Sequence, residues 1–443
     1  MLGVGNDFEN RGPECLQRLS LRLLDLREVA VDLSLCHARE LVIHTEVAAI
    51  LRAVTDADLL SPDFYGDIDG MHDAFRSMRA AGPVWRDKVN ELWAVVQHAP
   101  LIDVERRADV FSSSGCYRAR VALQEEDMIA KDDPAHHEQR ALVARRFTPK
   151  AVQRHAPEIA HITTDLIDGF FDNGELDIVD ELAAPFPARM TAGLLGIGDD
   201  KWPSVRSWSE RLMRIDAMED EAVMMGVISA IMEFSSVVLP LADERRTDPA
   251  DDLVSIWAGA ELNGRPLEQS VLVQETGLFI SGGAETTRTV IARGLIEFTR
   301  HPEQWDAMAA DPSLVPGAVE ELIRWVTPLN NFFRTATRDA TIADTMVAAG
   351  DRVMLAYPSA NRDELVFDDP YRFDIRRSPN PHCAFGFGTH VCLGASLARL
   401  ELRLLFTELT RRITNLRLLS EPDIEPNIFV GAVRSCRLGF DRR

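Results

Sequence analysis

Residues 385–399, FGFGTHVCLGASLAR, join a glycine-rich loop to a single cysteine. Glycines such as Gly388 permit a tight loop and the close approach of a flat or bulky group. Leucines at helical spacing follow, which predicts Cys392 at the N-terminus of a helix. The helix dipole and free backbone N–H groups at such an end favour a thiolate over a thiol. His390 adds a donor two residues earlier.

A lone thiolate is a poor zinc site, because zinc takes three or four protein ligands, but it is a good single axial ligand for haem iron. From the loop alone, a buried structural cysteine remains an alternative. Cys383 lacks this setting, so we expect an ordinary cysteine there.

A second motif, SGGAETTR, occupies residues 281–288. Two adjacent glycines inside a helix cost roughly 0.5–1 kcal/mol each relative to alanine, so a functional gain is the simplest reason for them. They let the backbone, at Gly283 in particular, lie against a cofactor. Glu285 and Thr286 add an acid and a hydroxyl, a pair that can relay protons. The alternative is an exposed polar patch.

A third group consists of cations. His136 and Arg140 lie one helical turn apart on one face, whereas His137 has Ala141 four residues later, so His136 is preferred. Arginine and histidine donors bind carboxylates, so this pair would suit a ligand that carries such groups. Taken singly, each is more often a plain surface or capping residue.

These motifs together resemble those of the cytochrome P-450 superfamily, whose haem-binding loop reads F-x-x-G-x-x-x-C-x-G. The resemblance implies a haem b cofactor (iron protoporphyrin IX), Cys392 as its proximal ligand and only metal ligand, and Phe385 beside the sulfur. The family's distal acid–threonine pair corresponds to Glu285 and Thr286, although many members carry Asp at the first position. The residues implied to bind the haem propionates are His136, Arg140, Arg334 and His390.

The sequence VEELIRW contains Glu321 and Arg324 three residues apart, which is typical of a helical ion pair. In the resembling family this pair is buried and is joined by an arginine from a later loop. We expect that arginine to be Arg377, with Arg376 the less favoured choice. The three residues would serve folding and cofactor retention.

The elements that must position these residues are mostly helical. No proline interrupts residues 267–300, which predicts one long helix through the interior. A helix is expected over residues 393–413 and short strands over 330–357. The fold class is mainly α with small β-sheets: a single-domain cytochrome P-450 fold, with haem between the long helix and the cysteine loop. The resemblance covers residues 67–443, and residues 1–66 are an N-terminal extension of unknown role.

Charge and cysteine usage limit the function classes. The net charge of −22 argues against a nucleic-acid binder. Six scattered cysteines predict a reducing, cytoplasmic location. No transmembrane segment is expected, because the best candidate stretch is broken by Glu233.

The resemblance implies a monooxygenase that inserts one atom of O2 into an apolar substrate. No flavin or ferredoxin segment is fused, so a separate ferredoxin with an NAD(P)H-dependent reductase would supply electrons. Stretches such as RSPNPH resemble the actinobacterial branch that hydroxylates sterol side chains and branched fatty acids. The alternatives are a peroxide-driven peroxygenase, which would not need Glu285 and Thr286, and a non-enzymatic haem-thiolate sensor. The basic residues expected to dock the electron donor are Arg145, Arg146, Lys150, Arg399 and Arg403.

The substrate pocket is expected between the long helix, the loop 111–131 and the segment 205–230. Apolar walls suit a large apolar substrate. The predicted wall residues are Leu278, Phe279, Ala284, Leu329, Phe332, Phe333, Ile428 and Phe429.

Overall fold

The computed structural model describes residues 57–120 and 125–443. Most of the predicted extension 1–66 therefore lies outside the described residues. One compact unit spans Asp56–Arg443. Leu59 and Tyr65 are buried in it, so this unit begins before residue 67.

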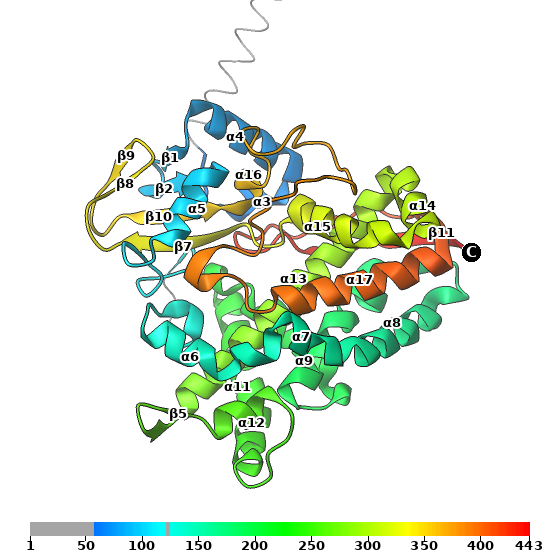
Figure 1. Ribbon diagram of the computed structural model, residues 1–443, viewed down its shortest axis with the longest axis horizontal. Helices are drawn as coiled ribbons and strands as arrows, with labels where there is room; N and C mark the ends of the chain where they lie inside the picture. Colours follow the sequence, from blue (N-terminus) through cyan, green and yellow to red (C-terminus); the bar gives the residue numbers. More distant parts are fainter. Residues whose placement is uncertain (1–56, 121–124) are drawn as a thin grey trace, which may run out of the picture. The chain divides into compact units, whose positions relative to one another are not determined.

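The long helix α13 (Gln269–Arg300) crosses the middle of this unit, which confirms the prediction of one helix over residues 267–300 (Figure 1). It packs against α9 (Pro185–Leu195), α10 (Trp202–Leu212), α11 (Glu221–Arg245) and α15 (Val315–Val326). Its second half is almost entirely buried in the main hydrophobic core. A helix surrounded in this way can present residues to a cavity only where its neighbours leave space.

A five-stranded sheet lies to one side, with the strand order β1 (Val84–Asp87), β2 (Leu92–Val95), β10 (Arg352–Ala356), β7 (Asn331–Ala336) and β3 (Phe111–Ser112). Only the β10–β2 pair is parallel. The strands predicted within 330–357 are thereby confirmed. The smaller sheets in the described residues comprise β4 (Glu175–Asp177), β11 (Ile413–Leu418) and β14 (Arg437–Arg442); β5 (Glu261–Leu262) and β6 (Arg265–Pro266); β8 (Ala340–Ile342) and β9 (Thr345–Val347); and β12 (Asp423–Ile424) and β13 (Val433–Ser435).

Helices make up most of the remaining unit, so the predicted class, mainly α with small sheets, is confirmed. The helix expected over 393–413 is α17 (Ala395–Arg412). The other α-helices are α3 (Pro62–Gly66), α4 (Ile68–Ala81), α5 (His98–Arg106), α6 (Ala135–Val143), α7 (Pro149–Val152), α8 (Ala156–Phe171), α12 (Leu253–Ala258), α14 (Pro302–Ala310) and α16 (Tyr357–Ala360).

A buried ion-pair network ties α15 to the chain that leads into the cysteine loop. Arg324 Nε and Nη2 each donate to Glu321 at 2.7 Å, and both side chains are fully buried. Arg377 Nε donates to Glu321 Oε1 at 3.2 Å, whereas Arg376 is exposed. The predicted choice of Arg377 is confirmed. Buried charges persist in proteins when they are paired and hydrogen-bonded in this way.

Among the described residues, α11 is the one helix long and apolar enough to cross a membrane by length and composition. Glu233 in its middle accepts hydrogen bonds from Trp208 and Arg211 of α10. These bonds hold α11 within the helical layer over α13.

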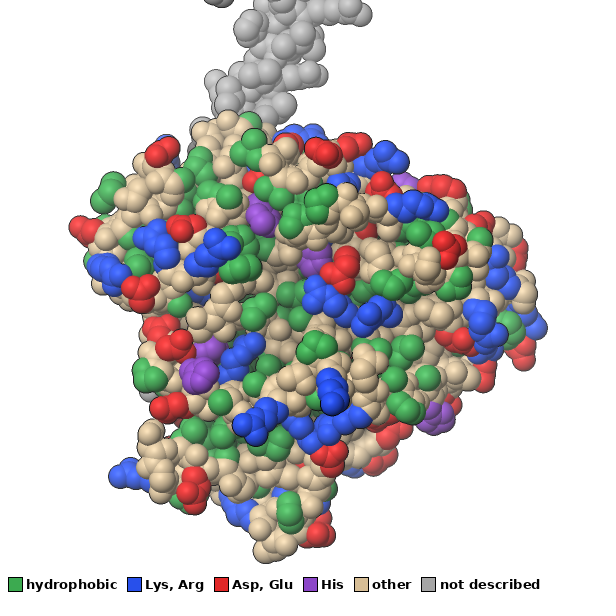
Figure 2. Space-filling model, in the orientation of Figure 1, with side chains coloured by type: hydrophobic (Ala, Val, Ile, Leu, Met, Phe, Trp, Pro, Cys, Tyr) green, Lys and Arg blue, Asp and Glu red, His purple; other side chains and the backbone are tan. Residues whose placement is uncertain are grey.

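Charge is unevenly spread over the surface. Figure 2 shows Lys and Arg side chains gathered in the middle of the viewed face, over α7 and the start of α17, while Asp and Glu side chains are common toward the rim. The five predicted docking cations lie in or directly before α7 and in the first half of α17: Arg145, Arg146, Lys150, Arg399 and Arg403.

Candidate active site

The loop before α17 is held by its own backbone. Cys392 N donates to Phe385 O at 2.8 Å, and Gly386 N donates to Cys383 O at 2.9 Å. Gly388 has a φ of 67°, and a Cβ there would lie 2.5 Å from the backbone oxygen of Glu105. Glycine is therefore required at residue 388 both by conformation and by contact. The loop places Cys392 at the start of α17, as predicted.

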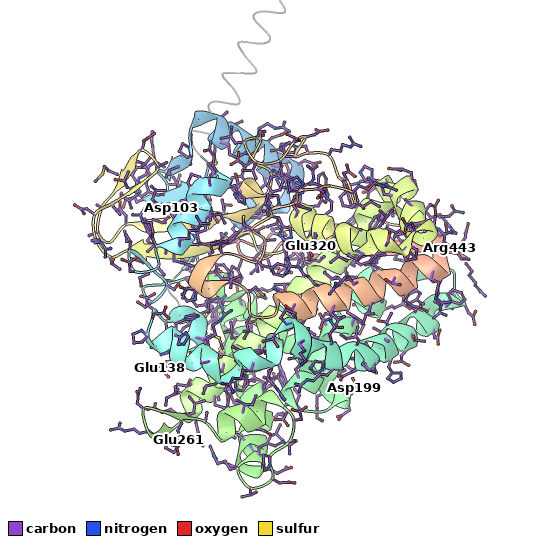
Figure 3. All side chains as sticks on the ribbon, viewed as in Figure 1. Asp103, Glu138, Asp199, Glu261, Glu320 and Arg443 are labelled. Carbon is purple, nitrogen blue, oxygen red and sulfur yellow. The ribbon has the colours of Figure 1, made fainter. Side chains whose placement is uncertain are left out.

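Phe385 is held from outside the loop. Arg399 on α17 lies 4.5 Å above the Phe385 ring and donates two hydrogen bonds to Glu320, on α15 where it runs beside α17 (Figure 3). His382 lies 3.1 Å from the same carboxylate. Burial raises the pKa of Glu320, but the hydrogen bonds from His382 and Arg399 outweigh burial and lower the pKa to about 2. The carboxylate therefore stays charged and keeps Arg399 over Phe385.

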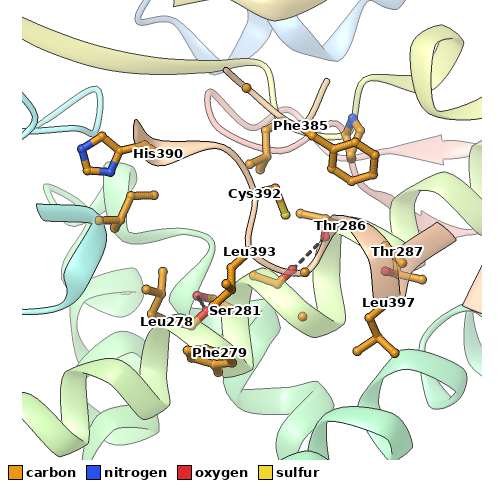
Figure 4. A pocket seen from close by; sticks show the side chains of 18 of the residues that line it. Leu278, Phe279, Ser281, Thr286, Thr287, Phe385, His390, Cys392, Leu393 and Leu397 are labelled. Carbon is orange, nitrogen blue, oxygen red and sulfur yellow. Dashed lines mark hydrogen bonds between the residues drawn. The ribbon is translucent and has the colours of Figure 1, made fainter. Parts of the chain in front are cut away.

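A cavity of about 260 Å³ lies between this loop and α13. Figure 4 shows Cys392 from the loop and Thr286 from α13 in the wall of this cavity, with apolar side chains such as Leu278 and Phe279 around them. Leu329, Phe332 and Phe429 also line it, as predicted, whereas three predicted wall residues do not: Ala284, Phe333 and Ile428. Those three are buried in packing elsewhere.

The two glycines of α13 have different neighbours. A Cβ on Gly282 would meet nothing within 4 Å, whereas one on Gly283 would lie 2.9 Å from Thr191 Oγ1 of α9. Gly282 therefore opens space in the cavity, and Gly283 allows α9 to approach. Both glycines border the cavity, so contact of Gly283 with the cofactor stays a prediction, while Gly282 provides the open space.

Thr286 and Glu285 face different surroundings. The Thr286 hydroxyl donates to Gly282 O at 2.8 Å and borders the cavity. Glu285 is buried outside the cavity lining, where Arg288 Nη1 donates to its Oε2 at 3.1 Å and also to Glu210 at 2.8 Å. Burial raises the pKa of Glu285 and Arg288 acts in the opposite direction. The structure thus brings only the hydroxyl of the predicted pair to the cavity, and the relay role of Glu285 stays a prediction.

The four predicted cations meet at one side of the cavity. The rings of His136 and His390 have centroids 4.2 Å apart, and Arg140 Nη2 donates to Val391 O at 2.7 Å. Arg334 reaches the same place from β7. Burial, together with Arg334, His136 and Arg140, lowers the pKa of His390 to about 3.

Two of these side chains have unused polar atoms. His136 Nε2 and His390 Nε2 are buried and have no hydrogen-bond partner. An unpaired buried polar atom is costly, so this cluster suits a ligand that carries anionic oxygens. The two propionates of haem fit that requirement.

The sulfur of Cys392 faces the cavity. Burial raises the pKa of its thiol, and the backbone N–H groups of Gly394 and Ala395 together with Arg140 and Arg399 only partly oppose this. The backbone donors predicted at the start of the helix are present. Without a bound cation, however, the thiol form of Cys392 is favoured over the predicted thiolate. A metal cation would supply the missing stabilisation.

The described part of the chain offers no competing metal site of its own. Among the described residues, no group of three or more His, Cys, Asp or Glu side chains could hold a metal ion. Cys383 is buried away from the cavity, and its N–H donates to Asn361 at 2.8 Å. These findings fit one protein ligand to an iron that is held mainly by a porphyrin.

Two residues that sequence reasoning missed also border the cavity. Glu105 accepts a hydrogen bond from Tyr357 Oη at 2.8 Å and lies 4.0 Å from Arg334. Burial raises the pKa of Glu105 to about 7, against the opposing effects of Arg334 and Tyr357. No local pattern marks them, because they meet only through the tertiary fold.

Comparison with known proteins shows to which protein family the chain belongs. The family model for cytochrome P450 matches residues 215–428. The steroid C26-monooxygenase of Mycobacterium tuberculosis is 40% identical over 393 residues, covering 87% of this chain and 97% of the relative. The methyl-branched lipid omega-hydroxylase of Mycobacterium bovis is 34% identical over 392 residues, covering 83% and 91%. A Mycobacterium marinum cytochrome P450 in complex with pseudoionone has a TM-score of 0.81 and 32% identity, covering 86% and 98%.

The chain belongs to the cytochrome P450 family. It is a haem monooxygenase whose iron is ligated by a cysteine, and it needs O2, an apolar substrate and electrons from a redox partner. The fold and cofactor expected from the sequence are confirmed.

We expect the change His136→Phe to weaken haem retention. The substitution keeps an aromatic ring against His390 but removes the nitrogen available to a propionate. Loss of a hydrogen bond to a charged group corresponds to a roughly tenfold to hundredfold faster haem loss, measured by transfer to apomyoglobin. His137→Phe on the exposed side of the same helix is the matched control. Equal haem loss in both variants would reject the choice of His136.

We also expect the change Cys392→Ser to abolish the red-shifted Soret band of the ferrous carbon monoxide complex, because that band requires a thiolate ligand. Cys383→Ser removes a buried thiol outside the cavity and should retain the band. Spectra of the two haem-loaded variants give the measurement. A normal band in the Cys392 variant would show that another residue binds iron.

Proposed function

We propose that this cytochrome P450 hydroxylates the apolar side chain of a steroid or a methyl-branched lipid. The observation that carries the proposal is the cavity wall between α13, the loop 111–131 and residues 427–430. Its members on these elements are largely apolar: Met128, Ile129, Leu278, Phe279 and Phe429. Relatives named for steroid and branched-lipid hydroxylation support this substrate class.

The haem, when bound, supplies the activation of dioxygen. Cys392 is proposed as its ligand, and His136, Arg140, Arg334 and His390 as the donors to its carboxylates. The Thr286 hydroxyl oxygen borders the cavity, and its proton, donated to Gly282 O in this structure, would have to leave that bond to be passed into the cavity. Glu285, next in sequence, is proposed to replenish that proton, and Arg288, which pairs with both Glu285 and the partly exposed Glu210, would hold the Glu285 carboxyl in place.

The substrate proposal is tested by titrating the haem-loaded enzyme with a cholestane-type steroid and with a methyl-branched fatty acid, followed by product analysis. We expect a spin-state shift and hydroxylation near the end of the apolar chain, because the apolar walls exclude water and pack against such a chain. If neither class shifts the spectrum or yields a hydroxylated product in a reconstituted system, the proposed substrate class is wrong.

We further propose that the electron donor is a separate acidic ferredoxin, reduced by an NAD(P)H-dependent reductase, and that it binds the basic area over α7 and the start of α17 (Figure 2). Lys and Arg side chains on an otherwise acidic protein offer charge complementarity to an acidic partner. We propose a cytoplasmic location as well, which the free cysteines among the described residues support.

The side chains in this basic area are not equally available. Arg399 is paired with Glu320 and Arg146 with Asp251, whereas Arg145 and Arg403 form no ion pair with any described residue. Arg145 and Arg403 can therefore be changed without breaking an existing pair.

We expect the double change Arg145→Glu and Arg403→Glu to slow electron transfer from ferredoxin about tenfold at low salt, with a smaller effect at high salt, because salt screens the attraction. Stopped-flow reduction under carbon monoxide gives the rates. Arg265→Glu in β6, an exposed arginine outside the basic area, is the control. Unchanged rates in the double variant would remove this surface from consideration.

A further inference from the structure

One cation in the cavity wall is not accounted for by haem. Arg118, in the chain between β3 and α6, is buried and lines the cavity. The pKa of His390 is influenced by Arg334, His136 and Arg140. The pKa of Arg118 is influenced by a different set of neighbours, Tyr117, Glu125 and Asp216. Arg118 therefore belongs to a different wall from the propionate donors.

The backbone at this position is tied to the sheet. Phe333 N of β7 donates to Tyr117 O at 2.9 Å, and Arg352 Nη2 of β10 donates to Arg118 O at 2.7 Å. Both bonds join this chain to rigid strands. The base of the Arg118 side chain is thus fixed before any ligand enters.

The guanidinium group is also held in place. Its Nε donates to Glu125 at 2.9 Å, and its central carbon lies 4.8 Å from the Tyr117 ring centre and 5.2 Å from that of Phe429. Such stacking on aromatic rings is favourable for arginine and restricts its rotation. Phe429 itself lines the cavity.

One nitrogen of the Arg118 guanidinium group lacks a hydrogen-bond acceptor. Arg118 Nη1 is buried and has no hydrogen-bond partner. A fixed, buried donor without an acceptor is unfavourable, and a ligand atom that accepts its hydrogen bond removes that cost. Because Arg118 lines the cavity, an oxygen on an otherwise apolar ligand would supply such an acceptor.

The charged side chains near Arg118 favour an uncharged ligand oxygen over a carboxylate. Glu125 already neutralises Arg118 through their ion pair. Asp127 and Asp216 are buried close by, and burial raises the pKa of Asp127 to about 7, with Glu125 acting in the same direction. A ligand carboxylate would add a further anion beside these acids, whereas a ketone would add an acceptor without charge.

We infer that Arg118 is a specificity-determining residue that binds an uncharged carbonyl oxygen at the end of the substrate remote from the hydroxylated carbon. The inference rests on the proposed function, because the reacting carbon must lie near Thr286 and Cys392, which line other walls. It favours a long apolar ketone, such as a steroid 3-ketone, over a branched fatty acid.

The first test changes the ligand and leaves the wild-type holoenzyme intact. Spin-state titrations compare cholest-4-en-3-one with its 3-methylidene analogue, in which C=CH2 replaces C=O, and with 15-methylhexadecanoic acid. We expect the ketone to bind roughly tenfold to hundredfold more tightly than the methylidene analogue, as for a hydrogen bond to a charged group. Equal affinities, or tightest binding of the carboxylate, would overturn the inference.

The second test changes the residue. Arg118→Met keeps a long side chain between Tyr117 and Phe429 but has no donor, so it should weaken ketone binding by the same factor and leave the methylidene analogue within about twofold. Arg120→Met, in the same loop, loses an ion pair with Glu219 outside the cavity and should change neither affinity. An equal loss for both ligands would mean that Arg118 contributes packing only.

Product analysis distinguishes a failure of the Arg118 inference from a failure of the proposed function. With the ketone anchor lost, the Arg118→Met enzyme should spread hydroxylation over several side-chain carbons, while the wild type favours one. If wild type binds and hydroxylates the ketone and the variant matches it in affinity and product, only the Arg118 inference fails. If the wild type neither binds nor hydroxylates any of the probes, the proposed function fails with it.

Discussion

The sulfur of Cys392 faces a largely apolar cavity, where a negative charge is unfavourable without a cation beside it, and the site is arranged around this constraint. Backbone N–H groups at the start of α17, with Arg140 and Arg399, favour the Cys392 thiolate, but burial outweighs them. With Cys392 as the proposed haem ligand, the iron would supply the remaining stabilisation, so ligation and ionisation of this cysteine would depend on one another. Elsewhere in the cavity the protein presents the unsatisfied ring nitrogens of His136 and His390 beside two arginines, and the cofactor brings anionic oxygens.

The parts that sequence reasoning predicted correctly are those carried by short-range spacing. The cysteine loop and its helix lie within one continuous stretch, and glycine at residue 388 is required by local conformation as well as by Glu105. His136, preferred over His137 because it has an arginine one turn later, lines the cavity, and its bond to a propionate stays a prediction. Arg377 was recognised through a family pattern, and its bond to Glu321 confirms it.

The parts that sequence reasoning could not predict depend on which neighbour meets which face of an element. Gly282 and Gly283 are equivalent in sequence, and only the approach of α9 distinguishes them. Glu105 and Tyr357 are far apart in the chain, and Arg118 is one of many loop arginines until Tyr117 and Phe429 enclose it. The start of the compact unit was placed late for the same reason, since the burial of Leu59 and Tyr65 arises from tertiary contacts.

The separation of Glu285 from Thr286 follows from helix geometry and has a functional consequence. Successive residues of an α-helix point about 100° apart, so a helix that turns Thr286 to the cavity turns Glu285 away from it. On that other side Arg288 and Glu210 pair with the acid. A carboxylate in the cavity wall itself would disfavour an apolar substrate, because the charge would lose its water when the substrate bound. By placing the acid behind the helix and only a hydroxyl in front, α13 keeps the charge of Glu285 out of the apolar part of the cavity wall.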